Sequence, residues 1–231
     1  MTHRSPHRIS TTGPVNAPFE AHDDDDDDDE CEDEPAKGDD KDKGGGRNWQ
    51  LDYLRKTRTI ELFGPVNNAL AKRVISGLFF LEADDPTRPI TLLQNSPGGS
   101  VTDGFAIYDA MRFVRPDIHV VCVGLTASIA TITLLGAKKE HRFSLPHTEF
   151  LIHQPLIPGT VYGRAADLEI TARQIIATRE RINRMLAAET GQPLEIVEQH
   201  TQRDYWMSAA EAVEYGLIAR IVPTRAELER L

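Results

Sequence analysis

The chain has few cysteines, which secreted proteins commonly use for disulfides. It also lacks a long hydrophobic run, which a membrane-spanning helix needs. Only Cys31 and Cys122 occur among 231 residues, and their positions are poorly suited to a structural disulfide, which is typical of a reducing compartment. No uninterrupted apolar segment approaches the length of a membrane span, and the N-terminus lacks the apolar core of a signal peptide. We therefore expect a cytoplasmic protein with no membrane contact.

A nucleotide-binding loop is also missing, and positive charge is in deficit. No GxxxxGK(S/T) motif occurs, so the chain has no phosphate loop for hydrolysing ATP by itself. The net charge of −10 argues against nucleic acid as a partner. The unbroken run from Asp23 to Asp29 has no turn-forming glycine inside it and no defined ligand geometry. We expect neither a metal nor a cofactor in this chain.

Negative charge is concentrated at the start of the sequence. Residues 1–47 carry 15 acidic and 6 basic side chains, a net charge of −9, whereas residues 48–231 carry 21 and 20, a net charge of −1. Like charges at this density repel, and few apolar groups offset the entropy cost of ordering, so we predict a disordered acidic tail over 1–47 that ends in a glycine hinge. This tail is either an electrostatic gate or adaptor-binding arm, or a segment that only maintains solubility.

Residues 48–231 are long enough for one domain with a sizeable core, and they alternate between strand and helix patterns. This alternation predicts an α/β domain with a largely parallel sheet and right-handed crossovers. The predicted strands are 59–64, 90–94, 120–124, 142–144, 149–152 and 217–222. The predicted helices are 66–82, one after the strand at 90–94, 127–137, 166–190 with Gly191 as its stop, and a short helix that begins with a Ser208–Glu211 capping box.

Ser128 lies where a strand pattern changes to a helix pattern. The run VVCVG at 120–124 is typical of a buried strand, and ASIATITLLGA at 127–137 has apolar residues at helical spacing. The free N–H groups and the positive dipole end of such a first turn favour a developing oxyanion. A serine that only caps the helix is favoured at the same position. The motif alone leaves both interpretations open.

A histidine and an aspartate further along the chain complete a nucleophile, base and acid set. A serine hydroxyl needs a base to accept its proton and a carboxylate to fix the tautomer of that base. His153 in FLIHQP and Asp204 in TQRDYW supply these residue types. The pattern around His153 is equally typical of a structural histidine at the end of a strand.

The sequence NSPGGS at 95–100 joins a strand to a helix through two adjacent glycines. Gly98 and Gly99 permit backbone conformations that other residues resist, and such a turn can direct N–H groups at an anion. A plain strand-to-helix turn is the alternative.

Taken in order, these segments resemble the proteolytic subunit of the ATP-dependent Clp protease, a serine peptidase family with a crotonase-like fold. The resemblance covers about residues 57–223 and rests on NSPGG, the TAS serine, the IHQP histidine, ETGQPLEIVEQHTQRD at 189–204 and MSAAEAVEYGLI at 207–218. It implies the Clp-protease α/β fold for a peptidase domain over 48–231.

The resemblance also implies a role for each of six residues. The nucleophile would be Ser128, the general base His153 and the orienting acid Asp204. The backbone N–H groups of Gly99 and Ile129 would form the oxyanion hole, and Gly98 would shape the turn.

The family's biology implies the partners. A Clp-type serine endopeptidase would assemble into homo-oligomeric rings, as stacked heptamers, and would cleave unfolded polypeptide delivered by an AAA+ unfoldase that uses the ATP. One alternative is a non-catalytic or regulatory ring paralogue. Another is a crotonase-like acyl-CoA enzyme, which shares the fold and holds an oxyanion with backbone N–H groups but does not require this serine and histidine.

Four departures from the family pattern concern assembly. Thr91 and Leu93 stand where the family commonly has aromatic residues for unfoldase docking, and no counterpart of the axial loop precedes Trp49. Gln202 precedes Arg203, where an acidic residue is common at the contact between rings, and the segment 155–166 is about two residues longer than the familiar pattern. These differences predict altered unfoldase docking and altered coupling between rings.

Overall fold

The computed structural model describes residues 49–156, 162–228 and 230. The described residues belong to one compact unit that begins at Gly46. The predicted acidic tail and glycine hinge at 1–47 lie outside the described residues, as does the central part of the segment 155–166.

Eight helices, one 3₁₀ turn and seven strands make up the described part of the chain. The helices are α1 (Trp49–Thr57), α2 (Asn68–Asp84), α3 (Val101–Phe113), α4 (Ile129–Leu134), α5 (Ala165–Thr190), α6 (Leu194–Thr201), α7 (Ala209–Tyr215) and α8 (Arg225–Leu228), with the 3₁₀ turn η1 at Lys139–His141. The strands are β1 (Thr59–Phe63), β2 (Ile90–Ser96), β3 (Ile118–Ala127), β4 (Arg142–Ser144), β5 (Glu149–Ile152), β6 (Tyr205–Ser208) and β7 (Arg220–Ile221).

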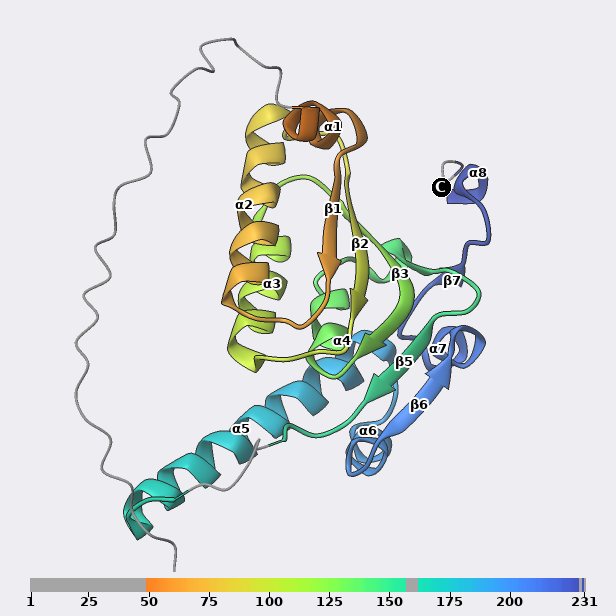
Figure 1. Ribbon diagram of the computed structural model, residues 1–231. Coiled ribbons are helices and arrows are strands. Elements are labelled where there is room, and N and C mark those ends of the chain that lie inside the picture. Colours follow the sequence, from red (N-terminus) through yellow and green to blue (C-terminus); the bar gives the residue numbers. More distant parts are fainter. Residues whose placement is uncertain (1–48, 157–161, 229, 231) are drawn as a thin grey trace, which may run out of the picture. The chain divides into compact units, whose positions relative to one another are not determined.

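The strands form one largely parallel sheet, as the alternating pattern predicts. The main order is β1-β2-β3-β4-β7, and all of these pairs are parallel. β3 is the branch point, because its first half pairs with β4 and its second half pairs with β5 (Figure 1). The one antiparallel pair joins β5 to β6. The C-terminal part of the chain is thereby attached to the end of β3.

One face of the sheet is packed and the other is partly open. Along β2, buried residues alternate with half-buried ones, so every second side chain enters the core. The packed face meets α2, α3 and α4 in one continuous cluster that includes Leu92, Val74, Ile107 and Ile132. On the opposite face a smaller cluster forms around Phe143. The docking positions Thr91 and Leu93 lie on this second face.

A bulge interrupts the pairing of β2 with β3 and changes the direction of the last residues of β3, which lead to Ser128. The parallel register runs from Ile90↔Ile118 to Gln94↔Cys122 and then shifts, so that Ser96 is opposite Thr126. Gly124 has φ +67 at the shift, and the Asn95 side chain fills the space beside it and accepts a hydrogen bond from the Leu125 N–H at 3.2 Å. The bulge turns the last residues of β3 toward β5.

Predicted and observed elements differ mainly at helix and strand ends. The helix expected over 127–137 is only 129–134, because a 3₁₀-like turn follows it, and the strand expected over 217–222 is only Arg220–Ile221. α5 ends at Gly191 in the left-handed conformation, as predicted, and the capping box of α7 is present. The sequence patterns predict neither the helices α1, α6 and α8 nor the strand β6.

The apolar residues of α5 have the spacing typical of a core stripe, but those in its first half do not enter the core. Ile182 and Leu186 are buried in the core, but Leu168 and Ile176 are exposed and Ile175 is only half-buried. Figure 1 shows the reason, because the N-terminal half of α5 extends past the other elements of its unit. Apolar periodicity identifies a face of a helix but not the partner that covers it.

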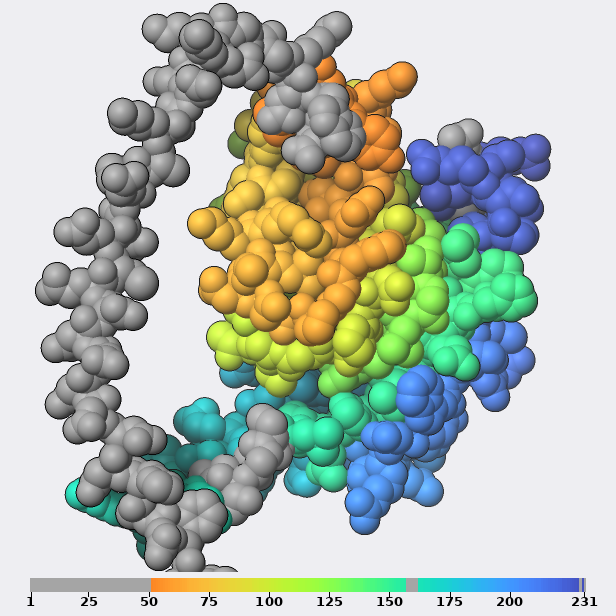
Figure 2. Space-filling model, in the orientation of Figure 1, coloured from red at the N-terminus to blue at the C-terminus, as the bar shows by residue number. Residues whose placement is uncertain are grey.

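The N-terminal and C-terminal elements of the described residues occupy different parts of the visible surface. Figure 2 shows the N-terminal elements in orange and yellow and the C-terminal elements in blue on opposite sides of this face, with green and teal segments between them. None of the helices in the described ranges has the length and apolar character needed to cross a membrane.

We predict that Cys122 resists alkylation in the folded protein. The side chain is fully buried in β3, and burial raises the pKa of its thiol to about 12, so the reactive thiolate is scarce at pH 8. Iodoacetamide labelling followed by mass mapping checks this, with labelling in urea as the positive control. Equal labelling rates of Cys122 in buffer and in urea would contradict a buried, neutral thiol.

Candidate active site

Ser128 occupies a strained junction between β3 and α4. Its backbone has φ 57 and ψ −128, a conformation that is usually left to glycine. The Ser128 N–H donates to the Leu151 carbonyl at 2.9 Å, and this bond ties the junction to β5. The side chain makes no capping hydrogen bond to the helix. The interpretation of Ser128 as a helix cap is therefore wrong, and its hydroxyl is directed elsewhere.

The hydroxyl belongs to a three-residue chain of hydrogen bonds. Ser128 Oγ lies 2.8 Å from His153 Nε2, and His153 Nδ1 lies 2.9 Å from Asp204 Oδ1. The three predicted residues, far apart in sequence, are thus brought together. Their order is the one expected for a nucleophile, a base and an orienting carboxylate. His153 would be only a structural histidine, as the alternative interpretation has it, if Ser128 had no chemical role.

The antiparallel pair of β5 and β6 explains how His153 meets Asp204. Ile152 at the end of β5 is opposite Tyr205 at the start of β6. Continuing this register by one residue in each direction places His153 opposite Asp204. The start of α4, the end of β5 and the start of β6 gather at one end of the sheet (Figure 1).

The site is buried on the side of the serine and histidine and exposed to solvent on the side of the aspartate. The His153 side chain is 13% exposed, whereas the Asp204 side chain is 63% exposed. Ser128 and His153 border a cavity of about 20 Å³ whose other walls are mostly apolar, among them Ile129, Ile152 and Leu186. The reacting groups would therefore be shielded from water more strongly than the carboxylate.

The double-glycine turn lies against the serine. A Cβ atom at Gly98, where φ is +92, would lie 2.6 Å from the Ser128 Cβ and 2.8 Å from the Ala127 carbonyl oxygen. A Cβ atom at Gly99, where φ is +149, would lie 2.2 Å from the Val66 carbonyl oxygen. Both positions therefore need glycine for conformation and for space.

Hydrogen bonds to Val66 hold the double-glycine turn in place. The Val66 N–H donates to the Gly98 carbonyl at 2.8 Å and the Ser100 N–H donates to the Val66 carbonyl at 2.8 Å, so the turn is fixed on both sides of Gly99. Within the described ranges, the N–H groups of Gly99 and Ile129 donate to no acceptor. These are the two groups that the resemblance assigns to an oxyanion hole, and that role stays a prediction.

A buried glutamine, which sequence reasoning missed, holds the first turn of α4. Gln94 in β2 is fully buried, and its Nε2 donates to the Ala130 carbonyl at 2.9 Å. Its Oε1 accepts a hydrogen bond from the Thr133 hydroxyl at 2.8 Å. The signal in the sequence is a polar residue at the end of the otherwise apolar strand ITLLQ.

A buried arginine holds the other end of α4 and was also missed. Arg142 in β4 has no exposed surface and donates to the carbonyls of Leu135 and Ala137, at 3.2 and 2.8 Å. It also pairs with Glu189 of α5. Since carbonyls at a helix C-terminus lack intrahelical donors, a guanidinium at this place satisfies them. α4 is thus anchored at both ends by side chains from the sheet.

No metal centre is apparent in the part of the chain that the structure describes, because no three His, Cys, Asp or Glu side chains there are placed to share an ion.

Comparisons with known proteins show which family the chain resembles in sequence and in structure. A family model described as Clp protease matches residues 44–225. Among solved structures, the chain is similar to a mutant of ClpP1 from Listeria monocytogenes, with 41% sequence identity and a TM-score of 0.71. That similarity covers 78% of this chain and 99% of the Listeria chain.

We predict that Gly98→Ala inactivates the protein and Gly64→Ala does not. The two glycines have nearly the same φ, +92 and +90, but an added Cβ at Gly64 would meet nothing within 4 Å. Gly64→Ala should therefore cost only the strain of a positive φ, about 1–2 kcal/mol. Gly98→Ala adds a collision with Ser128. Urea denaturation and peptide hydrolysis of both variants check this, and equal activity would contradict the importance of the close approach.

Proposed function

Because the chain belongs to the Clp protease family, we propose that it is a serine endopeptidase subunit of a self-compartmentalised ring. In this proposal the ring is cytoplasmic and hydrolyses unfolded polypeptides delivered by an AAA+ unfoldase, which supplies the ATP hydrolysis. The observation that carries the proposal is the hydrogen-bond chain from Ser128 through His153 to Asp204.

The first half of the reaction follows from the two short contacts. His153 Nε2 accepts the proton of the Ser128 hydroxyl as Oγ attacks the carbonyl carbon of the scissile peptide bond. Asp204 accepts the hydrogen bond from Nδ1–H, which leaves Nε2 free as the base and stabilises the imidazolium that forms. The imidazolium then gives its proton to the leaving amine as the C–N bond breaks, which leaves an acyl ester on Ser128.

The second half regenerates the serine. His153 accepts a proton from a water molecule that attacks the acyl ester, and then returns a proton to the Ser128 oxygen as the carboxylic acid product leaves. In both tetrahedral intermediates, the N–H groups of Gly99 and Ile129 would donate to the negatively charged oxygen. Such fixed donors stabilise charge that develops only on the way to the intermediate.

The two alternatives are less well supported by the geometry. A non-catalytic or regulatory paralogue has no need of a serine held in a strained conformation with hydrogen-bond distance to a histidine. An acyl-CoA enzyme of the crotonase type would use the backbone donors without this serine and histidine. Both alternatives leave the contacts of Ser128 without a purpose.

The exposed half of α5 supports assembly with further copies of the chain. Leu168, Ile170 and Ile176 lie on this half as exposed apolar side chains, and Ile170 is 59% exposed. In the ring proposal, a second copy covers them.

An exposed aromatic pair on the helices that cover the packed face of the sheet supports contact with a partner protein. Phe113 is 77% exposed at the end of α3 and makes an edge-to-face contact with Phe79 of α2, with ring centroids 6.1 Å apart. Exposed aromatic pairs of this kind suit recognition of an apolar segment from a partner protein. The altered docking positions Thr91 and Leu93 lie on the opposite face of the sheet, so they do not belong to this aromatic pair.

We predict that Ser128→Ala abolishes peptide hydrolysis without unfolding the protein. Loss of the nucleophile should lower the rate by about 10⁴–10⁶-fold. Because the hydroxyl caps no helix, the stability loss should be that of one hydrogen bond, about 0.5–1.5 kcal/mol. Hydrolysis of a short fluorogenic peptide, together with thermal unfolding, checks both parts.

A serine-directed fluorophosphonate probe provides the matching positive test. It should acylate Ser128 in the unmodified protein, and mass mapping should find the label on no other serine. Normal hydrolysis by the alanine variant, or a label elsewhere, would reject Ser128 as the nucleophile.

We further predict that Ile176→Asp separates stacked rings while Gln174→Asp does not. Both variants add one negative charge to the same exposed half of α5, but only the first removes an apolar side chain. Sedimentation velocity should show the unmodified protein and the glutamine variant as large assemblies and the isoleucine variant as smaller ones. A monodisperse, fully active monomer in the unmodified protein would overturn the ring proposal.

A further inference from the structure

The carboxylate of Asp204 depends on the backbone around it for its position. The side chain is 63% exposed, and within the described ranges its one hydrogen bond is the contact with His153 at 2.9 Å. An exposed aspartate with a single bond has many accessible rotamers and backbone positions. The turn from Gln202 to Asp204 must therefore be held by other contacts if the carboxylate is to stay opposite His153.

The first end of this turn is fixed on α5. Thr201, the last residue of α6, is buried, and its single hydroxyl proton has two acceptors within reach, Asn183 Oδ1 at 3.0 Å and the Val197 carbonyl at 2.9 Å. The far end is fixed from Tyr205 onward, where β6 pairs with β5. Only three residues, Gln202 to Asp204, lie between these two anchors.

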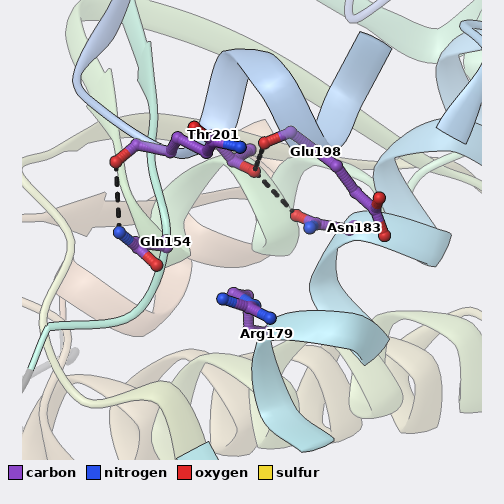
Figure 3. Close-up of a pocket in the computed structure, with 6 residues that line it drawn as sticks. Gln154, Arg179, Asn183, Glu198 and Thr201 are labelled. Atoms are coloured by element: carbon purple, nitrogen blue, oxygen red, sulfur yellow. Dashed lines mark hydrogen bonds between the residues drawn. The ribbon is translucent and has the colours of Figure 1, made fainter. Parts of the chain in front are cut away.

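Gln154 spans the gap with two hydrogen bonds. Its backbone N–H donates to the Thr201 carbonyl at 2.7 Å, and its side-chain Nε2 donates to the Gln202 carbonyl at 3.1 Å (Figure 3). Gln154 is also the neighbour of His153. His153, the proposed base, and Gln154, which binds the turn before Asp204, are therefore consecutive in the chain.

A polar cavity, rather than apolar packing, lies beneath the turn, whose Gln202 N–H also donates to the Gln199 carbonyl at 3.4 Å. The cavity has a volume of about 140 Å³, and Figure 3 shows Arg179 and Asn183 facing into it from α5. Its lining residues are Gln154, Arg179, Asn183, Glu198, Thr201 and Gln202. Because water can enter such a cavity, the turn is not packed against apolar side chains on this side. The Gln154 amide is its direct contact across the opening.

We infer that Gln154 is a positioning residue that acts through Asp204. Its side-chain amide holds the Gln202 carbonyl, which keeps the Asp204 carboxylate within hydrogen-bond distance of His153 and keeps Nε2 of that histidine directed at Ser128. The inference rests on the proposed role of the triad. It concerns the backbone carbonyl of Gln202, so it does not depend on the side chain that replaces the family's acidic residue.

Gln154→Met tests the amide, because methionine has a similar length but donates no hydrogen bond. We expect kcat for a short fluorogenic peptide to fall by about 10- to 100-fold, the scale of a misplaced catalytic group, while KM changes little. Gln154→Glu should cause a similar loss, since a carboxylate retains the shape but cannot donate to the carbonyl. The rate of fluorophosphonate labelling at Ser128 should fall in both variants.

A matched control comes from another glutamine. Gln192 Nε2 donates to the Tyr215 carbonyl at the same distance, 3.1 Å, but Tyr215 lies at the end of α7 rather than beside Asp204. Gln192→Met should therefore alter the melting temperature about as much as Gln154→Met and leave kcat unchanged.

The double variant with Asp204→Asn decides whether the effect passes through the acid. If Gln154 acts through Asp204, adding Gln154→Met to Asp204→Asn should cause no further loss of kcat. A Gln154→Met rate equal to that of the unmodified protein would overturn the inference, as would the same fold loss in both backgrounds. In these cases Ser128→Ala remains inactive. Full activity of Ser128→Ala would instead overturn the proposed function.

Discussion

The junction at Ser128 is the constraint on which the site depends. Its positive φ and the hydrogen bond from its N–H to Leu151 place the hydroxyl at the end of β5 and leave the Ile129 N–H free. A strained backbone of this kind costs of the order of 1–3 kcal/mol and persists only where surrounding contacts fix it. The bulge at Gly124, the close approach of Gly98 and the anchored helix α4 supply those contacts.

Buried polar groups, rather than apolar packing alone, fix the direction of α4. Gln94 binds the carbonyl of its first turn, and Arg142 binds the carbonyls that follow it while pairing with Glu189. Each of these groups would be costly to bury without a partner, so the geometry that satisfies them is strongly preferred. The ion pair also connects the serine helix to α5. Contacts made by α5 are therefore physically continuous with the site.

The remaining surfaces indicate how the subunit would be used. The exposed half of α5 and the aromatic pair of Phe79 and Phe113 lie on parts of the fold that the described residues leave exposed. Enclosing the site within an assembly would exclude folded proteins, while unfolded segments could reach Ser128. The same enclosure would add to the apolar shielding that already surrounds the hydroxyl.

The sequence by itself determined the class of fold and the order of most elements, and it singled out Ser128, His153 and Asp204, which the fold brings into contact. Alternating periodicities are local properties, and the motifs around Ser128, His153 and Asp204 carry their family resemblance in short segments. Only the tertiary structure decided that Ser128 is no helix cap, that Leu168 and Ile176 lie outside the core, and that Gln94, Arg142 and Gln154 support the site. Those facts depend on contacts between residues far apart in the chain, and a residue's type and neighbours in sequence do not specify its partner in space.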